Sequence, residues 1–194
     1  MRKLSVVLCL LLVSGAPAMA AGGEYEGYDL YRRGLYEEAM LHWTKAADAG
    51  DAGSAYRLAM EYYDAKVVKQ NLTRVRRYLE QAAAEDDPRA LHDLGSLYDN
   101  GVIVRLDRRR AAELYLRSAQ LGYAAAMFNI AVMLERGEGI REDKIEAYKY
   151  YLLSKSLGFG PFADQHLEIL EPKLSPAQRA EGQDRADNFT FGTL

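Results

Sequence analysis

The chain repeats itself every 36 residues, and this period restricts its fold more than any other feature of the sequence. Segments that start at Ser54, Ala90 and Ala126 align without a gap over nine residues. Each has a large apolar residue at its fifth position, a small residue at its sixth, and a large apolar or aromatic residue at its ninth. Such a period is typical of architectures in which one supersecondary unit is stacked on copies of itself.

Each unit is predicted to consist of two helices. Apolar residues recur at three- and four-residue spacing in both halves of the unit, which is the spacing of one helical face. Gly101 and Gly137 follow the first helices, where a left-handed residue commonly ends a helix. Asp107 and Asp143 precede the second helices as N-caps, and Glu146 completes a capping-box pattern with Asp143.

The first full unit departs from this pattern at its internal turn. Ala65 stands where the later units have glycine, and Asn71 stands where they have aspartate. Asn71 still caps a helix, but alanine adopts a positive φ only at a cost. We therefore expect this turn to differ from the other two.

These observations predict an all-α fold, an α-solenoid wound as a right-handed superhelix of helix-turn-helix repeats. A single helix pair cannot bury its apolar face, whereas stacked pairs can. The expected organisation is a signal peptide at 1–20, an N-terminal partial repeat or cap at 21–53, repeats at 54–89, 90–125 and 126–162, and C-terminal capping helices with a tail at 163–194.

The N-terminal segment has the order of a secretory signal peptide. Arg2 and Lys3 precede an apolar run from Leu4 to Val13, and small residues surround Met19 before a predicted cleavage after Ala20. The alternative is a membrane anchor, but the apolar run is about half of the roughly 20 residues that cross a bilayer. The sequence therefore predicts a periplasmic or secreted protein.

Composition narrows the possible functions of the mature chain. Cys9, the only cysteine, lies in the expected signal peptide, so cleavage would leave no disulfide and no thiolate. Loss of Arg2 and Lys3 would take the formal charge from −3 to −5, which argues against nucleic acid as the partner. No second apolar segment reaches the length of a transmembrane span.

The 36-residue unit resembles the Sel-one-like repeat, a branch of the tetratricopeptide-like superhelices. The resemblance covers most of the chain from Tyr28 to Ala163. It implies a solenoid that acts as an adaptor, and in bacterial envelopes such proteins serve in signalling, polysaccharide or motility assemblies and contacts with host cells. A cysteine-rich branch linked to penicillin recognition does not carry over, because its paired cysteines are absent. The second unit carries the motif most fully, at Leu94, Gly95, Tyr98, Gly101, Val104, Asp107, Ala111, Tyr115, Ser118, Ala119 and Gly122.

In the tetratricopeptide arrangement the first helices line a concave face, and inward positions lie one turn apart. We therefore predict a groove that binds an extended peptide or a helix, with aromatic and methionine side chains as anchors. The alternative is that Tyr56 and Phe128 fill the seam between neighbouring units. The predicted groove residues are Tyr56, Met60, Tyr63, His92, Ser96, Phe128 and Val132.

Cations gather at the internal turns of the first and second units. Stacking places them on one edge of the rod, so they form either an anion-binding strip or an ordinary solvated edge. An acidic partner, an anionic envelope glycan or a lipid headgroup would fit such a strip. The predicted anion-binding edge consists of Lys66, Lys69, Arg105, Arg108 and Arg109.

No residue pattern indicates catalysis. His42, His92 and His166 lack a spaced partner that would predict a metal site, and no serine lies in a nucleophile-elbow context. We therefore predict a non-catalytic protein-interaction module of the bacterial envelope, without cofactor or metal. The alternatives are a structural component associated with the cell wall or exopolysaccharide, and a hydrolase.

Overall fold

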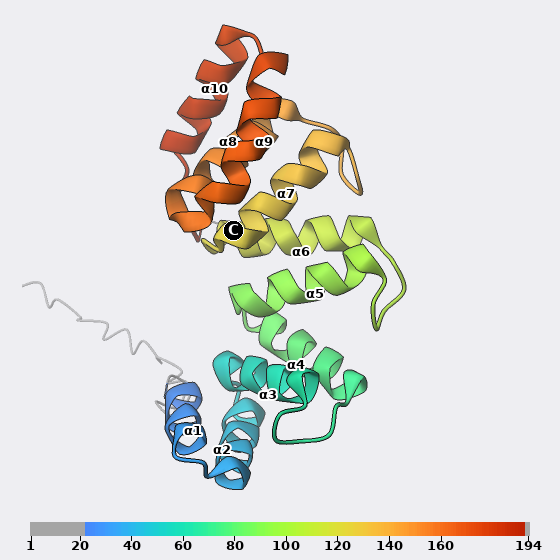
Figure 1. The fold of residues 1–194 in the computed structure, drawn as a ribbon, viewed down its shortest axis with the longest axis vertical. Coiled ribbons are helices and arrows are strands. Elements are labelled where there is room, and N and C mark those ends of the chain that lie inside the picture. Colours follow the sequence, from blue (N-terminus) through green and yellow to red (C-terminus); the bar gives the residue numbers. More distant parts are fainter. Residues whose placement is uncertain (1–21, 193–194) are drawn as a thin grey trace, which may run out of the picture.

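The structure, a computed structural model, describes residues 22–192. Within this range the chain forms ten α-helices and no strand, and the helices stack along one long axis, from α1 at the bottom of Figure 1 to α10 at the top. This confirms the predicted all-α solenoid. The expected signal peptide at 1–20 lies outside the described residues. The helices are α1 (Gly23–Arg32), α2 (Tyr36–Asp48), α3 (Ala52–Asp64), α4 (Leu72–Ala84), α5 (Pro88–Asn100), α6 (Arg108–Gln120), α7 (Ala124–Arg136), α8 (Lys144–Ser154), the π-helical η1 (Lys155–Phe159), α9 (Gly160–Leu170), the 3-10 helix η2 (Glu171–Lys173) and α10 (Pro176–Asp187).

None of the helices between residues 22 and 192 combines the length and the apolar character that are needed to cross a bilayer.

The repeat positions predicted from sequence meet in the core. Leu58, Leu94 and Ile130 are buried, and so are the small residues that follow them. The small residues are needed because the partner helix of the same unit lies close by. A Cβ atom built on Gly95 would lie 3.0 Å from the Tyr115 ring, tighter than an ordinary packing contact.

The second helices of the three units begin with the same cap. The side chains of Asn71, Asp107 and Asp143 each accept a hydrogen bond from the backbone N–H three residues further on, at 3.0, 3.0 and 2.9 Å. The predicted capping box at Asp143 is nevertheless wrong. The N–H of Asp143 donates to the carbonyl of Leu134 in the preceding helix, so it does not require the Glu146 side chain.

The C-terminal helix α10 leaves the regular pattern. It packs against α8, whereas α4, α6 and α8 each pair with the helix immediately before them. A Cβ atom on Gly182 would lie 2.7 Å from the Tyr148 ring, so glycine permits this close approach. The chain then runs back along the stack, where the N–H of Gly192 donates to the carbonyl of Gln120 (Figure 1). As a result α8 is covered on several sides and is buried over most of its length.

The turn after α3 differs from the other two, as expected, because Ile103 and Gly139 adopt φ 69° and 72° whereas Val67, at the equivalent position, has no positive φ. The difference does not lie at Ala65 itself. Ala65 adopts φ 56° and ψ 31°, close to the 65° and 29° of Gly101 and the 68° and 29° of Gly137. Packing of α3 against α4 on both sides of the turn therefore imposes the left-handed conformation on a residue that disfavours it. This conformation costs an alanine roughly 1–2 kcal/mol.

Replacement of Ala65 by glycine should therefore stabilise the protein. We expect Ala65→Gly to raise the free energy of unfolding by about 0.5–1 kcal/mol, since relief of strain exceeds the added entropy of the unfolded chain. Gly101→Ala is the matched control and should destabilise, because its Cβ would also lie 3.1 Å from the Leu106 Cβ. Urea unfolding followed by circular dichroism measures both changes. Equal effects of the two variants would contradict this explanation.

Candidate partner-binding surface

The odd-numbered helices contact one another directly along one face of the solenoid. The Tyr56 hydroxyl of α3 donates to Oδ2 of Asp93 in α5 over 3.0 Å. His92 of α5 contacts Asn129 of α7, with 3.1 Å between Nε2 and Nδ2. Phe128 of α7 then packs edge-on against His166 of α9, with 5.1 Å between ring centroids. We call this surface the first-helix face.

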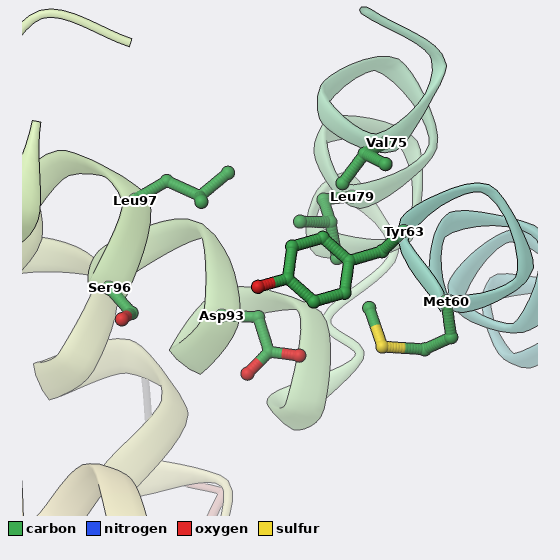
Figure 2. Close-up of a pocket in the computed structure, with 7 residues that line it drawn as sticks. All are labelled: Met60, Tyr63, Val75, Leu79, Asp93, Ser96 and Leu97. Atoms are coloured by element: carbon green, nitrogen blue, oxygen red, sulfur yellow. The ribbon is translucent and has the colours of Figure 1, made fainter. Parts of the chain in front are cut away.

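A cavity of about 210 Å³ opens on this face between α3 and α5, and α4 forms its floor. Figure 2 shows Met60 and Tyr63 reaching into it from α3, Val75 and Leu79 from α4, and Asp93 with Ser96 and Leu97 from α5. Met60, Tyr63 and Ser96 are thus three of the seven predicted groove residues that line one space. Tyr63 is 50% exposed and stands at the rim.

Tyr56 and His92 lie beside this cavity, and each contacts a residue of the neighbouring unit. The Arg89 guanidinium lies 4.5 Å from the centre of the Tyr56 ring. Burial, together with the Asp93 carboxylate, raises the pKa of the Tyr56 hydroxyl well above its usual range. His92 contacts the rings of Tyr115 and Tyr123, with centroid distances of 5.6 and 5.2 Å. Both side chains fill the seam between units and hold Asp93 at the edge of the cavity.

The last two predicted groove residues belong to a separate cluster. Phe128 packs against Phe159 and Phe162, with centroid distances of 5.5 and 6.3 Å, and the half-buried Val132 lies on the same helix. Phe162 is 59% exposed, so an aromatic patch ends the first-helix face at α9.

Glu135 lies next to this aromatic patch and is fully engaged. It accepts a hydrogen bond from the Tyr151 hydroxyl at 2.9 Å and pairs with Lys173 at 3.4 Å. Although burial favours the protonated acid, these donors hold the pKa of Glu135 below its usual value.

Sequence reasoning missed the residues that give the cavity its shape and its charge. Val75, Leu79 and Leu97 line the cavity but were not among the predicted groove residues. Asp93 was passed over because only positions one turn apart were considered, and it lies beside His92. One feature of the sequence could have pointed to Asp93. It is a charged residue next to His92, and the following unit has Asn129 at the equivalent position.

The cations of the predicted edge are mostly paired with carboxylates. Lys66 lies 2.8 Å from Asp64, and Arg109 lies 3.6 Å from Glu113. Arg108 lies 3.7 Å from Asp99 and 3.6 Å from Glu138. Arg105 and Lys69 form no ion pair with any described residue, and Arg105 and Arg108 line an open hollow with Arg76.

A second hollow, of about 370 Å³, lies on the opposite face between α4 and α6. Each charged side chain that lines it forms an ion pair with a nearby side chain of opposite charge. Glu80 bonds Arg76 at 3.0 Å, Arg110 bonds Glu113 at 3.0 Å, and Arg117 bonds Asp86 at 2.6 Å. Among residues 22–192, no three histidine, aspartate or glutamate side chains are grouped in a way that could hold a metal ion.

An ion-pair network ties α1 to the first-helix face. Glu24 bonds Arg57 of α3 and Arg89 of α5, each at 2.8 Å, and Arg89 also bonds Asp87. Only 17% of the Glu24 side chain is exposed. Burial alone would favour the protonated acid, but the two guanidinium groups outweigh it and lower the pKa of Glu24 below its ordinary 4.5.

This lowered pKa makes part of the stability dependent on pH. Glu24 should contribute fully above pH 4.5, and its contribution should disappear as the pH falls through the lower pKa of the folded state. At neutral pH we expect Glu24→Gln to cost roughly 1–3 kcal/mol. The difference from the unmodified chain should shrink under acid conditions, as measured by urea unfolding at several pH values.

Glu26→Gln provides the control, because that side chain is 72% exposed and lies 3.3 Å from His42. It should change stability by less than about 0.5 kcal/mol. A loss in Glu24→Gln that stays constant down to pH 3 would contradict the role given to this network.

Comparison with known proteins gives a match to one family. The profile of the Sel1 repeat matches residues 16–51, 52–87, 88–123 and 124–159. The last three segments begin at the first residues of α3, α5 and α7. The first segment overlaps the expected signal peptide.

Individual relatives share parts of the chain. Chitin synthase regulatory factor 2 of Schizosaccharomyces pombe is 33% identical over 95 residues, which are 44% of this chain and 19% of that protein. The chain therefore matches about a fifth of the length of this curated relative.

Solved structures share the fold. A protective antigen of uropathogenic Escherichia coli with an SLR fold superposes with a TM-score of 0.74 at 22% identity, over 88% of this chain and 37% of the antigen. A Sel1 repeat protein from Oxalobacter formigenes gives 0.63 at 27% identity, over 66% of this chain and 96% of that protein.

Proposed function

Because the chain belongs to the Sel1 repeat family, we propose that it binds a partner polypeptide along the first-helix face and catalyses no reaction itself. Sel1 repeat proteins are typically non-catalytic modules for protein–protein interaction. The observation that carries the proposal is the cavity between α3 and α5, which combines an apolar floor with an exposed tyrosine at its rim.

The chemistry of this face suits an extended peptide or a helix. Anchoring side chains of a partner bind most strongly where they enter desolvated pockets, and aromatic and methionine residues contribute much of the contact. Met60 and Tyr63 supply these groups at the cavity, and Phe128 with Phe162 supplies them at the other end of the face. The face therefore offers two apolar contact regions, and polar side chains of α5 and α7 lie between them.

We also propose that the protein acts in the cell envelope after export. The charged start, the apolar run and the small residues before Ala21 support this localisation. The relative from uropathogenic Escherichia coli is a protective antigen, which agrees with exposure of that protein to a host. The name of the yeast relative describes a regulatory factor, and this agrees with action on another protein.

Site-specific photocrosslinking in the source cell tests which surface binds. We expect a photoreactive phenylalanine at position 63 to capture one partner, while the same group at position 109, on the basic edge, captures none. Met60→Ala and Tyr63→Ala should each weaken binding of that partner by about tenfold, as is common for central anchors. Tyr25→Ala is the control, because Tyr25 is 76% exposed on α1 and does not line the cavity.

The opposite result would favour the basic edge. Capture at position 109, combined with affinity that falls steeply with salt and in the double variant Arg108→Glu, Arg109→Glu, would replace the first-helix face by the edge as the binding surface.

Export has its own test. We expect the protein recovered from the periplasm or the medium to begin at Ala21, as measured by mass spectrometry of the intact chain. A full-length protein that remains in the cytoplasm would contradict the proposed localisation.

A further inference from the structure

We propose that the cavity between α3 and α5 takes a long basic side chain, lysine or arginine, of the partner polypeptide, with Asp93 as its counter-ion. This inference rests on the proposed function and adds a ligand chemistry to it. Three features of the site support it, namely the apolar floor, the Asp93 carboxylate and the aromatic rim.

The floor fits the methylene stem of such a side chain. Met60, Val75, Leu79 and Leu97 present apolar atoms to the cavity. Its volume of about 210 Å³ is several times the roughly 30 Å³ that one water molecule occupies in the liquid. Lysine and arginine bury their aliphatic stems along apolar surface and keep the charged end at a polar group. An apolar floor with one carboxylate beside it matches both parts of such a side chain.

Asp93 is the carboxylate among the residues that line the cavity, and no lysine or arginine of the described residues offsets its charge. Its Oδ2 accepts from the Tyr56 hydroxyl at 3.0 Å, and its Oδ1 lies 2.9 Å from Nδ1 of His92. No lysine or arginine nitrogen of the described residues lies within 4 Å of it. A carboxylate has about four acceptor positions, so both oxygens can accept a further hydrogen bond.

The neighbouring cations are already engaged elsewhere. Arg89, which stacks on Tyr56, directs its nitrogens to Glu24 and Asp87, at 2.8 and 2.6 Å. Arg57 also bonds Glu24. The side chains around Asp93 are therefore fixed without neutralising it, and the site is prepared for a cation from outside.

The rim adds a second attraction for a cation. Tyr63 is half exposed, and in Figure 2 its ring stands over the space between Met60 and Asp93. An ammonium or guanidinium group that approaches the face of an aromatic ring is attracted by the electrons of that ring. A basic side chain that reaches Asp93 passes this ring.

Two other parts of the surface lack this combination. On the opposite face each charged side chain has an ionic partner, as described above for Glu80, Arg110 and Arg117. At the C-terminal end of the first-helix face, Glu135 is already bonded to Tyr151 and Lys173. Asp93 is thus the carboxylate of the first-helix face that can accept a ligand cation at the edge of an apolar space.

Selection from a random peptide library displayed on phage tests the inference. The purified chain should enrich peptides with lysine or arginine at one fixed position next to apolar residues. Asp93→Asn keeps the shape of the side chain and the acceptor for Tyr56, so the fold should persist, but the preference for a basic residue should disappear. Asp99→Asn is the matched control on the same helix, because Asp99 is paired with Arg108 and does not line the cavity.

A synthetic peptide from the selection provides the quantitative measurement. Replacement of its basic residue by norleucine, and Asp93→Asn in the protein, should each weaken binding by about tenfold. The two changes together should weaken binding no more than either alone, because they remove the same contact. The norleucine peptide tests the contact even if the protein variant folds poorly.

Three outcomes would overturn the proposal in distinguishable ways. Enriched peptides without a basic position would refute the ligand chemistry and leave peptide binding intact. Additive effects of the two substitutions would place the basic residue at another site. Absence of any enriched peptide would count against the proposed function itself.

Discussion

The structure depends on one constraint, which is that no helix pair of this chain can bury its apolar surface alone. Each pair covers the next, and the two helices of a pair approach closely because small residues stand at fixed positions, as Gly95 illustrates against the Tyr115 ring. The 36-residue period follows from this requirement, because the same contact must recur in every unit. The period also brings equivalent side chains of neighbouring units together, and this produces both the core and the first-helix face.

The sequence predicted the features that repeat. Asn71, Asp107 and Asp143 cap their helices as expected, and Gly101 and Gly137 end theirs in the left-handed conformation. It did not predict features that arise from tertiary contacts outside the repeated motif. Ala65 adopts the same conformation as the two glycines because the helices on both sides fix it, a tertiary effect that no local propensity contains. The position of α10 on α8 likewise depends on the fit of Gly182 to the Tyr148 ring.

The candidate site was predicted in part for the same reason. Met60, Tyr63 and Ser96 were placed correctly on one face by helical spacing, yet spacing does not tell which of the facing residues meet in a cavity. Tyr56 and His92 lie in the seam, where they bond Asp93 and Asn129 of the adjacent helices. Asp93 could be identified only from the structure, because its distinguishing feature is that no lysine or arginine of residues 22–192 pairs with it. The role of these residues in binding stays a proposal.

The most direct measurement of the central claim is amide hydrogen exchange of the chain with and without a peptide that it has selected. The claim is that stacking of the units creates a ligand site between α3 and α5. Slower exchange should therefore appear in α3 and α5 on binding, while the amides of α10 and of the turn between α5 and α6 keep their rates. Protection confined to that turn, or to α9 and α10, would contradict the account.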